Sequence, residues 1–235
     1  MSEEKFTEHW KVTTFTDNPT FPFVIFDNWY TPEQEKAIWK ELDFISTPSR
    51  EETLRAETTI VAKDSETKEP LSKAYRYYLE DYYGKRSVSP ILNCMYKQRT
   101  PEFHKILKDN CLPYARSFLA TNRDSTLLSY YEDNDHYRPH FDSFMWTCLI
   151  WMVRDRDLFT GADFWFPEPD VEIKLKNNRM VMFPSCYKHA VNPLKFHKTP
   201  KEMGYGKYTI THFYYAVPEG PSIKELTEGS SNENK

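Results

Sequence analysis

Apolar residues in the first half of the chain recur mostly at helical spacing. Residues 31–34, Thr-Pro-Glu-Gln, combine a polar N-cap, a proline at the first helical position and a glutamine at N3, which is typical of a helix start. Ile38, Leu42 and Ile45 then fall on one face. The pattern predicts an amphipathic helix, preceded by a short buried strand at residues 23–26.

Two further helices are expected before residue 120. One is predicted by apolar and aromatic residues at helical spacing with a glycine behind them, namely Leu71, Tyr75, Tyr78, Leu79, Tyr82 and Gly84. The other begins near residues 100–102 and must end or kink at Pro113; it carries Phe103, Ile106 and Leu107. We expect these helices to cover one face of a sheet.

From Thr126 onward the pattern changes to short strands separated by turn signals. The predicted strands are residues 127–131, 146–153, 164–166, 171–175, 180–183 and 207–217. Several are apolar on both faces, as expected for strands between a barrel interior and covering helices. At 235 residues the chain fits one domain. We place it at residues 1–218, with a helical and strand part at 20–120, a core at 125–218 and a disordered polar tail at 219–235.

Composition and charge exclude several classes of function. A formal net charge of −4 and a pI near 6.0 give no electrostatic footprint for nucleic acid or for an anionic membrane. Residues 1–5 are polar with no apolar region behind them, so we expect a cytoplasmic protein without a membrane partner. Cys94, Cys111, Cys148 and Cys186 follow neither CxxC spacing nor a disulfide framework. Reduced, mostly buried thiols are therefore predicted.

Candidate chemistry is concentrated at His140-Phe141-Asp142. On an extended strand, residues i and i+2 point to the same face, so His140 and Asp142 can bind one metal while Phe141 turns away. Two imidazoles and one carboxylate, without a thiolate, suit a non-haem Fe(II) centre with open coordination positions. A second histidine must then come from another strand.

His189 is the candidate for that second histidine, because it follows the predicted strand 180–183 and a turn. His212 is a rival. Alternation along the last strand argues against His212, since Lys207 and Thr209 share one face of the strand and His212 lies on the other. The remaining histidines lack such a context: His9, His104, His136 and His197.

Five elements follow one another between Leu127 and Val217. They are Tyr131 with residues 140–142, the strand 146–151, residues 161–167, residues 183–185 with 189–193, and Gly206-Lys207-Tyr208-Thr209-Ile210. This order resembles the 2-oxoglutarate- and Fe(II)-dependent oxygenases, and within them the prolyl 4-hydroxylase-like branch. A bare HxD is weak evidence, whereas five elements in family order are strong.

The resemblance implies a mostly β fold with flanking helices, in which a double-stranded β-helix (a jelly roll of the cupin-like kind) is covered by N-terminal helices. His140, Asp142 and His189 would be the catalytic iron ligands. The enzyme would need Fe(II), 2-oxoglutarate and O2, with ascorbate as reductant. It would hydroxylate an unactivated C–H bond and release succinate and CO2.

The resemblance also implies which residues contact the cosubstrate. Lys207 would pair with the far carboxylate of 2-oxoglutarate, because an unpaired charge in a barrel interior is costly. The other expected contacts are Tyr131, Thr147, Trp151 and Thr209. The segment 195–203 is longer than the family usually has, so Lys198 stays an alternative partner for the carboxylate.

The substrate stays open at this level. A prolyl or other amino-acid residue is indicated by analogy, and a small molecule is the alternative. Phe213 stands where nucleobase demethylases of the family carry an arginine, which disfavours that branch. Arg138, the N-terminal half and the loop 154–160 are candidates for substrate contacts. Two other classes are also open: a non-catalytic cupin-like binding protein, and an Fe(II) oxygenase that does not use 2-oxoglutarate.

Overall fold

A seven-stranded antiparallel sheet organises the chain. The computed structural model describes residues 10–15, 22–47, 63–110 and 115–218. The strands of this sheet are, in spatial order, β1 (Lys11–Phe15), β2 (Phe23–Asp27), β11 (Arg179–Pro184), β7 (Trp146–Met152), β14 (Lys207–Tyr215), β5 (Arg123–Tyr131) and β4 (Tyr75–Tyr78). β14, the last described strand along the chain, therefore lies in the interior of the sheet between β5 and β7.

A second, five-stranded sheet faces the first. Its strands are, in spatial order, β10 (Val171–Ile173), β9 (Phe164–Phe166), β12 (His189–Val191), β6 (His136–His140) and β3 (Ser72–Lys73), and β13 (Leu194–Phe196) pairs separately with β8 (Phe159–Gly161). Apolar side chains from both sheets form one cluster between them, including Leu149, Phe164 and Val181. Two antiparallel sheets packed face to face in this way confirm the predicted jelly-roll core.

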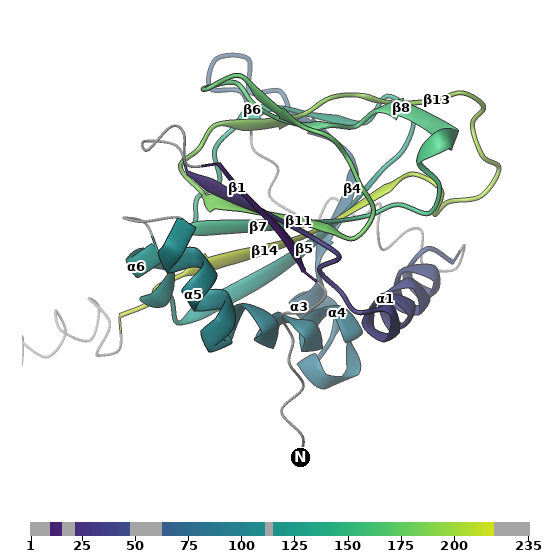
Figure 1. Cartoon of the computed structure of the whole chain (residues 1–235). Helices are drawn as coiled ribbons and strands as arrows, with labels where there is room; N and C mark the ends of the chain where they lie inside the picture. The colour runs from purple at the N-terminus through teal and green to yellow at the C-terminus, as the bar shows by residue number, and fades with distance from the viewer. Residues whose placement is uncertain (1–9, 16–21, 48–62, 111–114, 219–235) are drawn as a thin grey trace, which may run out of the picture.

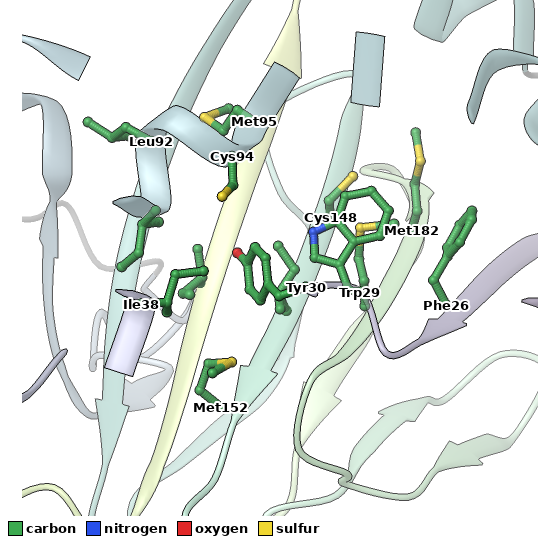
Figure 2. Close-up of a cluster of buried hydrophobic side chains, with 14 of the residues drawn as sticks. Phe26, Trp29, Tyr30, Ile38, Leu92, Cys94, Met95, Cys148, Met152 and Met182 are labelled. Carbon is green, nitrogen blue, oxygen red and sulfur yellow. The ribbon is translucent and has the colours of Figure 1, made fainter. Parts of the chain in front are cut away.

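Helices cover the outer face of the seven-stranded sheet, as predicted (Figure 1). They are α1 (Pro32–Ile45), α3 (Leu79–Tyr82), α4 (Pro90–Asn93), α5 (Pro101–Asn110) and α6 (Ala115–Leu119), with the 3-10 helices η2 (Arg86–Val88) and η3 (Cys94–Arg99). A further 3-10 helix, η4 (Arg156–Leu158), lies away from this face and leads into β8. Figure 2 shows Trp29 and Tyr30 against the strand residues Cys148, Met152 and Met182 in the core that these helices enclose.

The start of α1 follows the predicted capping chemistry. The Thr31 hydroxyl accepts the backbone N–H of Gln34 at 3.3 Å, and the Gln34 side-chain oxygen accepts the backbone N–H of Thr31 at 3.1 Å. Ile38, Leu42 and Ile45 are buried against the sheet, as the spacing predicted. Both the helix and its buried face are therefore confirmed.

The two faces of β14 serve different cores. Tyr208, Ile210 and Tyr214 pack into the helix-covered cluster. Because side chains alternate along a strand, Lys207 and Thr209 point the other way, between the two sheets. This alternation brings the predicted cosubstrate residues to the barrel interior.

The helix predicted over residues 71–82 is wrong for most of its length. Residues 72–73 and 75–78 are the strands β3 and β4, and only Leu79–Tyr82 is helical. The tyrosines fit strand as well as helix, and pairing of β4 with β5 decides between the two. As part of β4, Arg76 lies opposite Ser129 of β5 and faces the barrel interior.

The other predicted elements are confirmed with small shifts. The helix predicted near residues 100–102 is α5, although Pro113 lies outside the described residues. All six predicted strands of the second half are present, and β5 begins earlier than expected, at Arg123. The short strands β1, β8, β12 and β13 were not predicted.

The cysteine prediction is correct for Cys94 and Cys148, which are buried free thiols. Cys186 is free but exposed, and Cys111 lies outside the described residues, as does the tail from residue 219. No helix in the described ranges combines the length and the apolar character needed to cross a bilayer. The domain limits at residues 1–218 stay a prediction.

Candidate metal and cosubstrate site

Pairing of β6 with β12 brings the two predicted histidine ligands together. His189 lies directly opposite His140 in the register of these strands. Nε2 of His189 lies 3.4 Å from Oδ2 of Asp142, and Nε2 of His140 lies 3.7 Å from Oδ1. One ligand atom from each of the three residues fits within a mutual distance of 4.8 Å, the one such potential metal-binding cluster among the described residues.

The two imidazoles are held with their Nε2 atoms toward this centre. Nδ1 of His140 lies 2.9 Å from the carbonyl oxygen of Arg138, and Nδ1 of His189 lies 2.8 Å from that of Tyr187. A carbonyl partner can only accept, so each Nδ1 carries the proton and each Nε2 is free to bind a metal. Burial, followed by the neighbouring His189, lowers the pKa of His140 to about 2, so that imidazole is neutral at physiological pH.

Asp142 is positioned from beyond the strand. We expected His140 and Asp142 on one extended strand, but β6 ends at His140 and Asp142 follows it. Phe141, predicted to turn away, is 56% exposed but lies at the rim of the cavity beside the ligands. The Thr147 hydroxyl donates to Oδ2 of Asp142 at 2.7 Å and lies 2.8 Å from the Ser185 hydroxyl. Thr147, predicted as a cosubstrate contact, is therefore engaged in orienting Asp142.

A cavity of about 320 Å³ opens beside the three residues. Its lining includes His140, Asp142 and His189 together with Arg76, Tyr78, Leu127, Ser129, Tyr131, Tyr137, Phe144, Leu149, Trp151, Phe164, Thr209, Thr211 and Phe213. Three of the predicted cosubstrate residues, Tyr131, Trp151 and Thr209, thus line one space with the candidate ligands. The loop 154–160, expected to contact substrate, does not line it.

Lys207 is buried beside this cavity and does not line it. Its ammonium lies 5.2 Å from the ring centres of both Tyr131 and Trp151 and donates to the carbonyl oxygen of Ala162 at 2.9 Å. Burial lowers the pKa of Lys207 to about 7. The rival Lys198 is exposed on the segment after β13 and is also absent from the lining.

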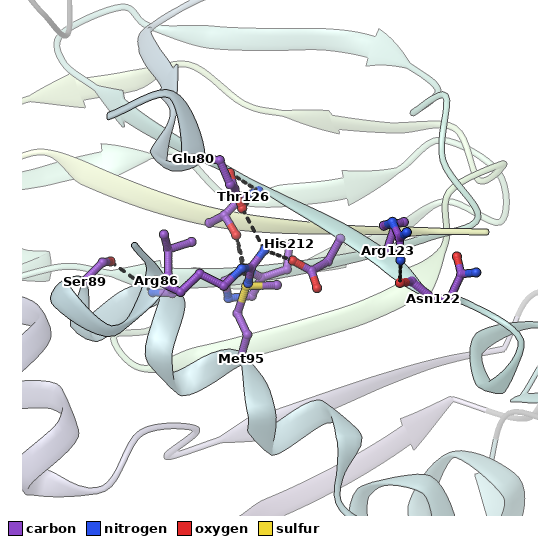
Figure 3. Close-up of polar contacts among 10 residues, drawn as sticks. Glu80, Arg86, Ser89, Met95, Asn122, Arg123, Thr126 and His212 are labelled. Atoms are coloured by element: carbon purple, nitrogen blue, oxygen red, sulfur yellow. Dashed lines mark hydrogen bonds and ion pairs between the residues drawn. The ribbon is translucent and has the colours of Figure 1, made fainter. Parts of the chain in front are cut away.

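His212 lies on the opposite face of β14, as alternation predicted. Figure 3 shows it among helix-side polar contacts, where its Nδ1 is 3.0 Å from the Thr126 hydroxyl. Burial lowers the pKa of His212 to about 3, so it is neutral there. It cannot reach the metal centre from that face.

The site also contains residues that the sequence pattern did not identify. Arg76 is only 5% exposed, and its guanidinium lies 5.1 Å from the ring centre of Tyr137, which stacks on His140 at 3.4 Å. Tyr78 enters the cavity from the same strand, and its pKa is raised by burial and then by the charge of Asp142. Alternation over residues 75–78 is the signal that would have found both, but it was hidden by the helical interpretation.

The segment that holds the candidate ligands matches a protein-family model. The model of the 2OG-Fe(II) oxygenase superfamily matches residues 126–215, which include all three candidate ligands. The match covers less than half of the chain and identifies this segment as a 2OG-Fe(II) oxygenase domain, which supports an enzyme of that class. No curated protein matches the oxygenase sequence significantly.

Solved prolyl hydroxylases share the fold of this oxygenase. A prolyl hydroxylase from Trichoplax adhaerens, in complex with a hypoxia inducible factor peptide fragment, matches 90% of the chain and 87% of its own at a TM-score of 0.53 and 13% identity. A Pseudomonas putida prolyl-4-hydroxylase matches 90% of the chain and 95% of its own at a TM-score of 0.52 and 11% identity. At such identities the likeness establishes the fold, which is that of the branch predicted from the motif order.

The donor set of the cavity fits Fe(II) and 2-oxoglutarate. Three ligand atoms leave open metal positions for a bidentate cosubstrate and O2. Nε of Arg76, Nε1 of Trp151 and Oγ1 of Thr209 are buried without a hydrogen-bond partner in the described part of the chain. Buried polar groups are normally satisfied, so these atoms mark where an oxygen-rich ligand belongs.

Proposed function

We propose that the protein is an Fe(II)- and 2-oxoglutarate-dependent hydroxylase with His140, Asp142 and His189 as the metal ligands. The observation that carries the proposal is the convergence of these three groups at the wall of the cavity, inside the segment that matches the superfamily. When bound, Fe(II) with 2-oxoglutarate and O2 would supply the oxidising power for C–H hydroxylation, with succinate and CO2 as coproducts.

The chain's own residues would prepare the site for that chemistry. Thr147 holds the Asp142 carboxylate, and the backbone carbonyl groups hold both imidazoles in the metal-binding tautomer. Aromatic walls including Tyr131 and Phe164 would exclude water around the reacting carbon. We propose Lys207 as the partner of the far carboxylate, which would reach its ammonium between the rings of Tyr131 and Trp151.

We propose a prolyl residue of a peptide as the substrate. The rim of the cavity is aromatic, with Phe141 exposed and Phe144 stacked on Phe213 at 4.3 Å between ring centres. Aromatic grooves are suited to the stiff, apolar proline ring. The peptide complex of the Trichoplax prolyl hydroxylase, which has the same fold, agrees with this choice. A small molecule is the alternative substrate.

Two further proposals follow from the chemistry of the centre and of the thiols. Ascorbate would serve as reductant, because Fe(II) lost to oxidation must be restored. The free thiols of Cys94, Cys148 and Cys186 are those of a protein kept in a reducing compartment, and we propose the cytoplasm.

Anaerobic titration with Fe(II) and 2-oxoglutarate tests the proposed function. The wild-type protein should develop the weak visible charge-transfer band of the chelate, and admission of O2 should then yield succinate. His140→Ala should abolish both signals, whereas His136→Ala, on the same strand but outside the cavity lining, should leave them intact.

Each alternative class predicts a different result in this titration. A non-catalytic cupin-like protein would bind metal and form no succinate. An Fe(II) oxygenase without 2-oxoglutarate would consume O2 and show no chelate band. Either result would refute the proposal.

A further inference from the structure

Arg76 is a buried cation that has no carboxylate partner among the residues the structure describes. Its side chain donates to the Ser72 hydroxyl and lies over the Tyr137 ring. Within the described ranges, no carboxylate lies within ion-pair distance of it. An uncompensated buried charge costs several kcal/mol, so its retention at the wall of a cavity calls for a bound anion.

Arg76 belongs to a row of polar side chains that crosses the sheet. In the strand registers, Arg76 of β4 lies opposite Ser129 of β5, Ser129 lies opposite Thr209 of β14, and Thr209 lies opposite Trp151 of β7. All four residues line the cavity. Neighbouring strands are about 4.8 Å apart, so the row extends about 14 Å from end to end.

Three of the four members carry an unsatisfied polar atom. Nε of Arg76, Oγ1 of Thr209 and Nε1 of Trp151 have no hydrogen-bond partner among the described residues. Arg76 and Thr209 are each 5% exposed and Trp151 is fully buried, so bulk water does not satisfy them. The small Ser129 between them leaves the row open to a ligand. Because these three unsatisfied atoms lie on one row that lines the cavity, they can all contact the same ligand.

We propose that this row, Arg76-Ser129-Thr209-Trp151, binds a carboxylate of a ligand in the cavity. The planar guanidinium of Arg76 matches the two oxygens of a carboxylate, and the Thr209 hydroxyl and the Trp151 indole N–H, farther along the row, can hydrogen-bond other polar atoms of the same ligand. The inference rests on the proposed function to the extent that the cavity is the hydroxylation site.

The two ligands of that site can each supply the carboxylate. The far end of 2-oxoglutarate is one source, in which case Lys207 is not its partner. The substrate is the other. In that case Lys207 neutralises the far carboxylate of the cosubstrate. The charges of the divalent metal, the Asp142 carboxylate, the 2-oxoglutarate dianion and the Lys207 ammonium then sum to zero. Arg76 is then a surplus positive charge, which selects a substrate with an acidic group next to the carbon that reacts.

Binding to protein loaded with Mn(II) separates these sources without turnover. Calorimetry first measures the affinity for N-oxalylglycine, an unreactive isostere of 2-oxoglutarate. It then measures the affinities for N-acetyl-L-proline and for its amide, with N-oxalylglycine present. Arg76→Gln removes the charge, and Arg123→Gln is the control. Arg123 is exposed at the start of β5 and is absent from the cavity lining.

Arg76→Gln should weaken one carboxylate interaction at least tenfold, and Arg123→Gln should weaken neither. A loss of affinity for N-oxalylglycine in this variant assigns the row to the cosubstrate. If the variant instead loses the preference for N-acetylproline over its amide and keeps its affinity for N-oxalylglycine, the row is assigned to the substrate. If Arg76→Gln does not fold, Thr209→Val must weaken one of the same interactions. Unchanged affinities in the folded variant, or wild-type protein that binds no carboxylate probe, overturn the proposal.

Failure of the proposed function gives a different pattern. Wild-type protein would then fail to bind N-oxalylglycine, whether or not it binds Mn(II). The proline pair is also titrated into metal-free protein, so a carboxylate preference that depends on Arg76 still decides the role of the row.

Discussion

Replacing Lys207 by methionine should make the ligand-free protein more stable while weakening 2-oxoglutarate binding. Methionine has nearly the length of lysine without its charge. Burial lowers the pKa of the Lys207 ammonium from 10.5 to about 7. Since one pKa unit corresponds to about 1.4 kcal/mol, the buried charge costs the folded state on the order of 5 kcal/mol at pH 6. The variant also leaves the Ala162 carbonyl oxygen without its donor, which costs about 1 to 3 kcal/mol.

The net gain of roughly 2 to 4 kcal/mol should raise the unfolding temperature by about 4 to 16 °C, because 1 kcal/mol shifts it by roughly 2 to 4 °C in a protein of this size. The direction in which this destabilisation changes with pH follows from the lowered pKa of Lys207. A lysine whose folded pKa lies below its unfolded pKa destabilises the fold fully below pH 7, and this cost fades as pH rises from 7 toward 10.5. The cost falls to about 2 kcal/mol at pH 9, so the advantage of the variant should shrink.

Thermal unfolding at pH 6 and pH 9, with and without Mn(II) and 2-oxoglutarate, measures both effects. Wild-type protein should gain stability from 2-oxoglutarate, and Lys207→Met should lose most of that gain. Lys198→Met, an exposed lysine in the segment after β13, is the matched control and should behave as wild type. A lower unfolding temperature for Lys207→Met at pH 6, with the 2-oxoglutarate gain retained, would refute both the buried-charge argument and the cosubstrate role.

Three other substitutions test separate parts of the site. Thr147→Val removes the hydroxyl that holds Asp142, so Mn(II) affinity measured by calorimetry should fall about 10- to 100-fold, with an unchanged affinity counting against this orienting role. Gly206→Ala places a Cβ against the carbonyl oxygen of Tyr131, so urea unfolding should show a clear loss of stability, and wild-type stability would mean that the backbones separate freely. Asp142→Gly should abolish succinate formation without lowering the unfolding temperature by more than a few degrees; succinate formed at the wild-type rate would exclude Asp142 as a ligand.

Local signals in the sequence predicted the parts of the structure that depend on local chemistry. The start of α1 was readable because its capping box involves residues three positions apart. The placement of Lys207 and His212 on opposite faces of β14 followed from the two-residue period of a strand. His140 and Asp142 were readable as a pair because they are two residues apart.

Features that depend on pairing between distant segments were not readable. The tyrosines of residues 75–78 fit either a helix or a strand, and contact with β5, some fifty residues later in the chain, made them a strand. That contact also turned Arg76 into the cavity. The row from Arg76 to Trp151 needs three strand registers at once, and no periodicity within one segment contains that information.

The position of β14 has a consequence for synthesis of the protein. Its neighbours β5 and β7 lie well before it in the sequence, yet β14 occupies the place between them. Because a ribosome adds roughly 5 to 20 residues per second, β5 and β7 must wait several seconds after emergence for the strand that joins them. During that time each exposes an unpaired edge, and chaperones that shield strand edges should matter most for the yield of this protein at that stage.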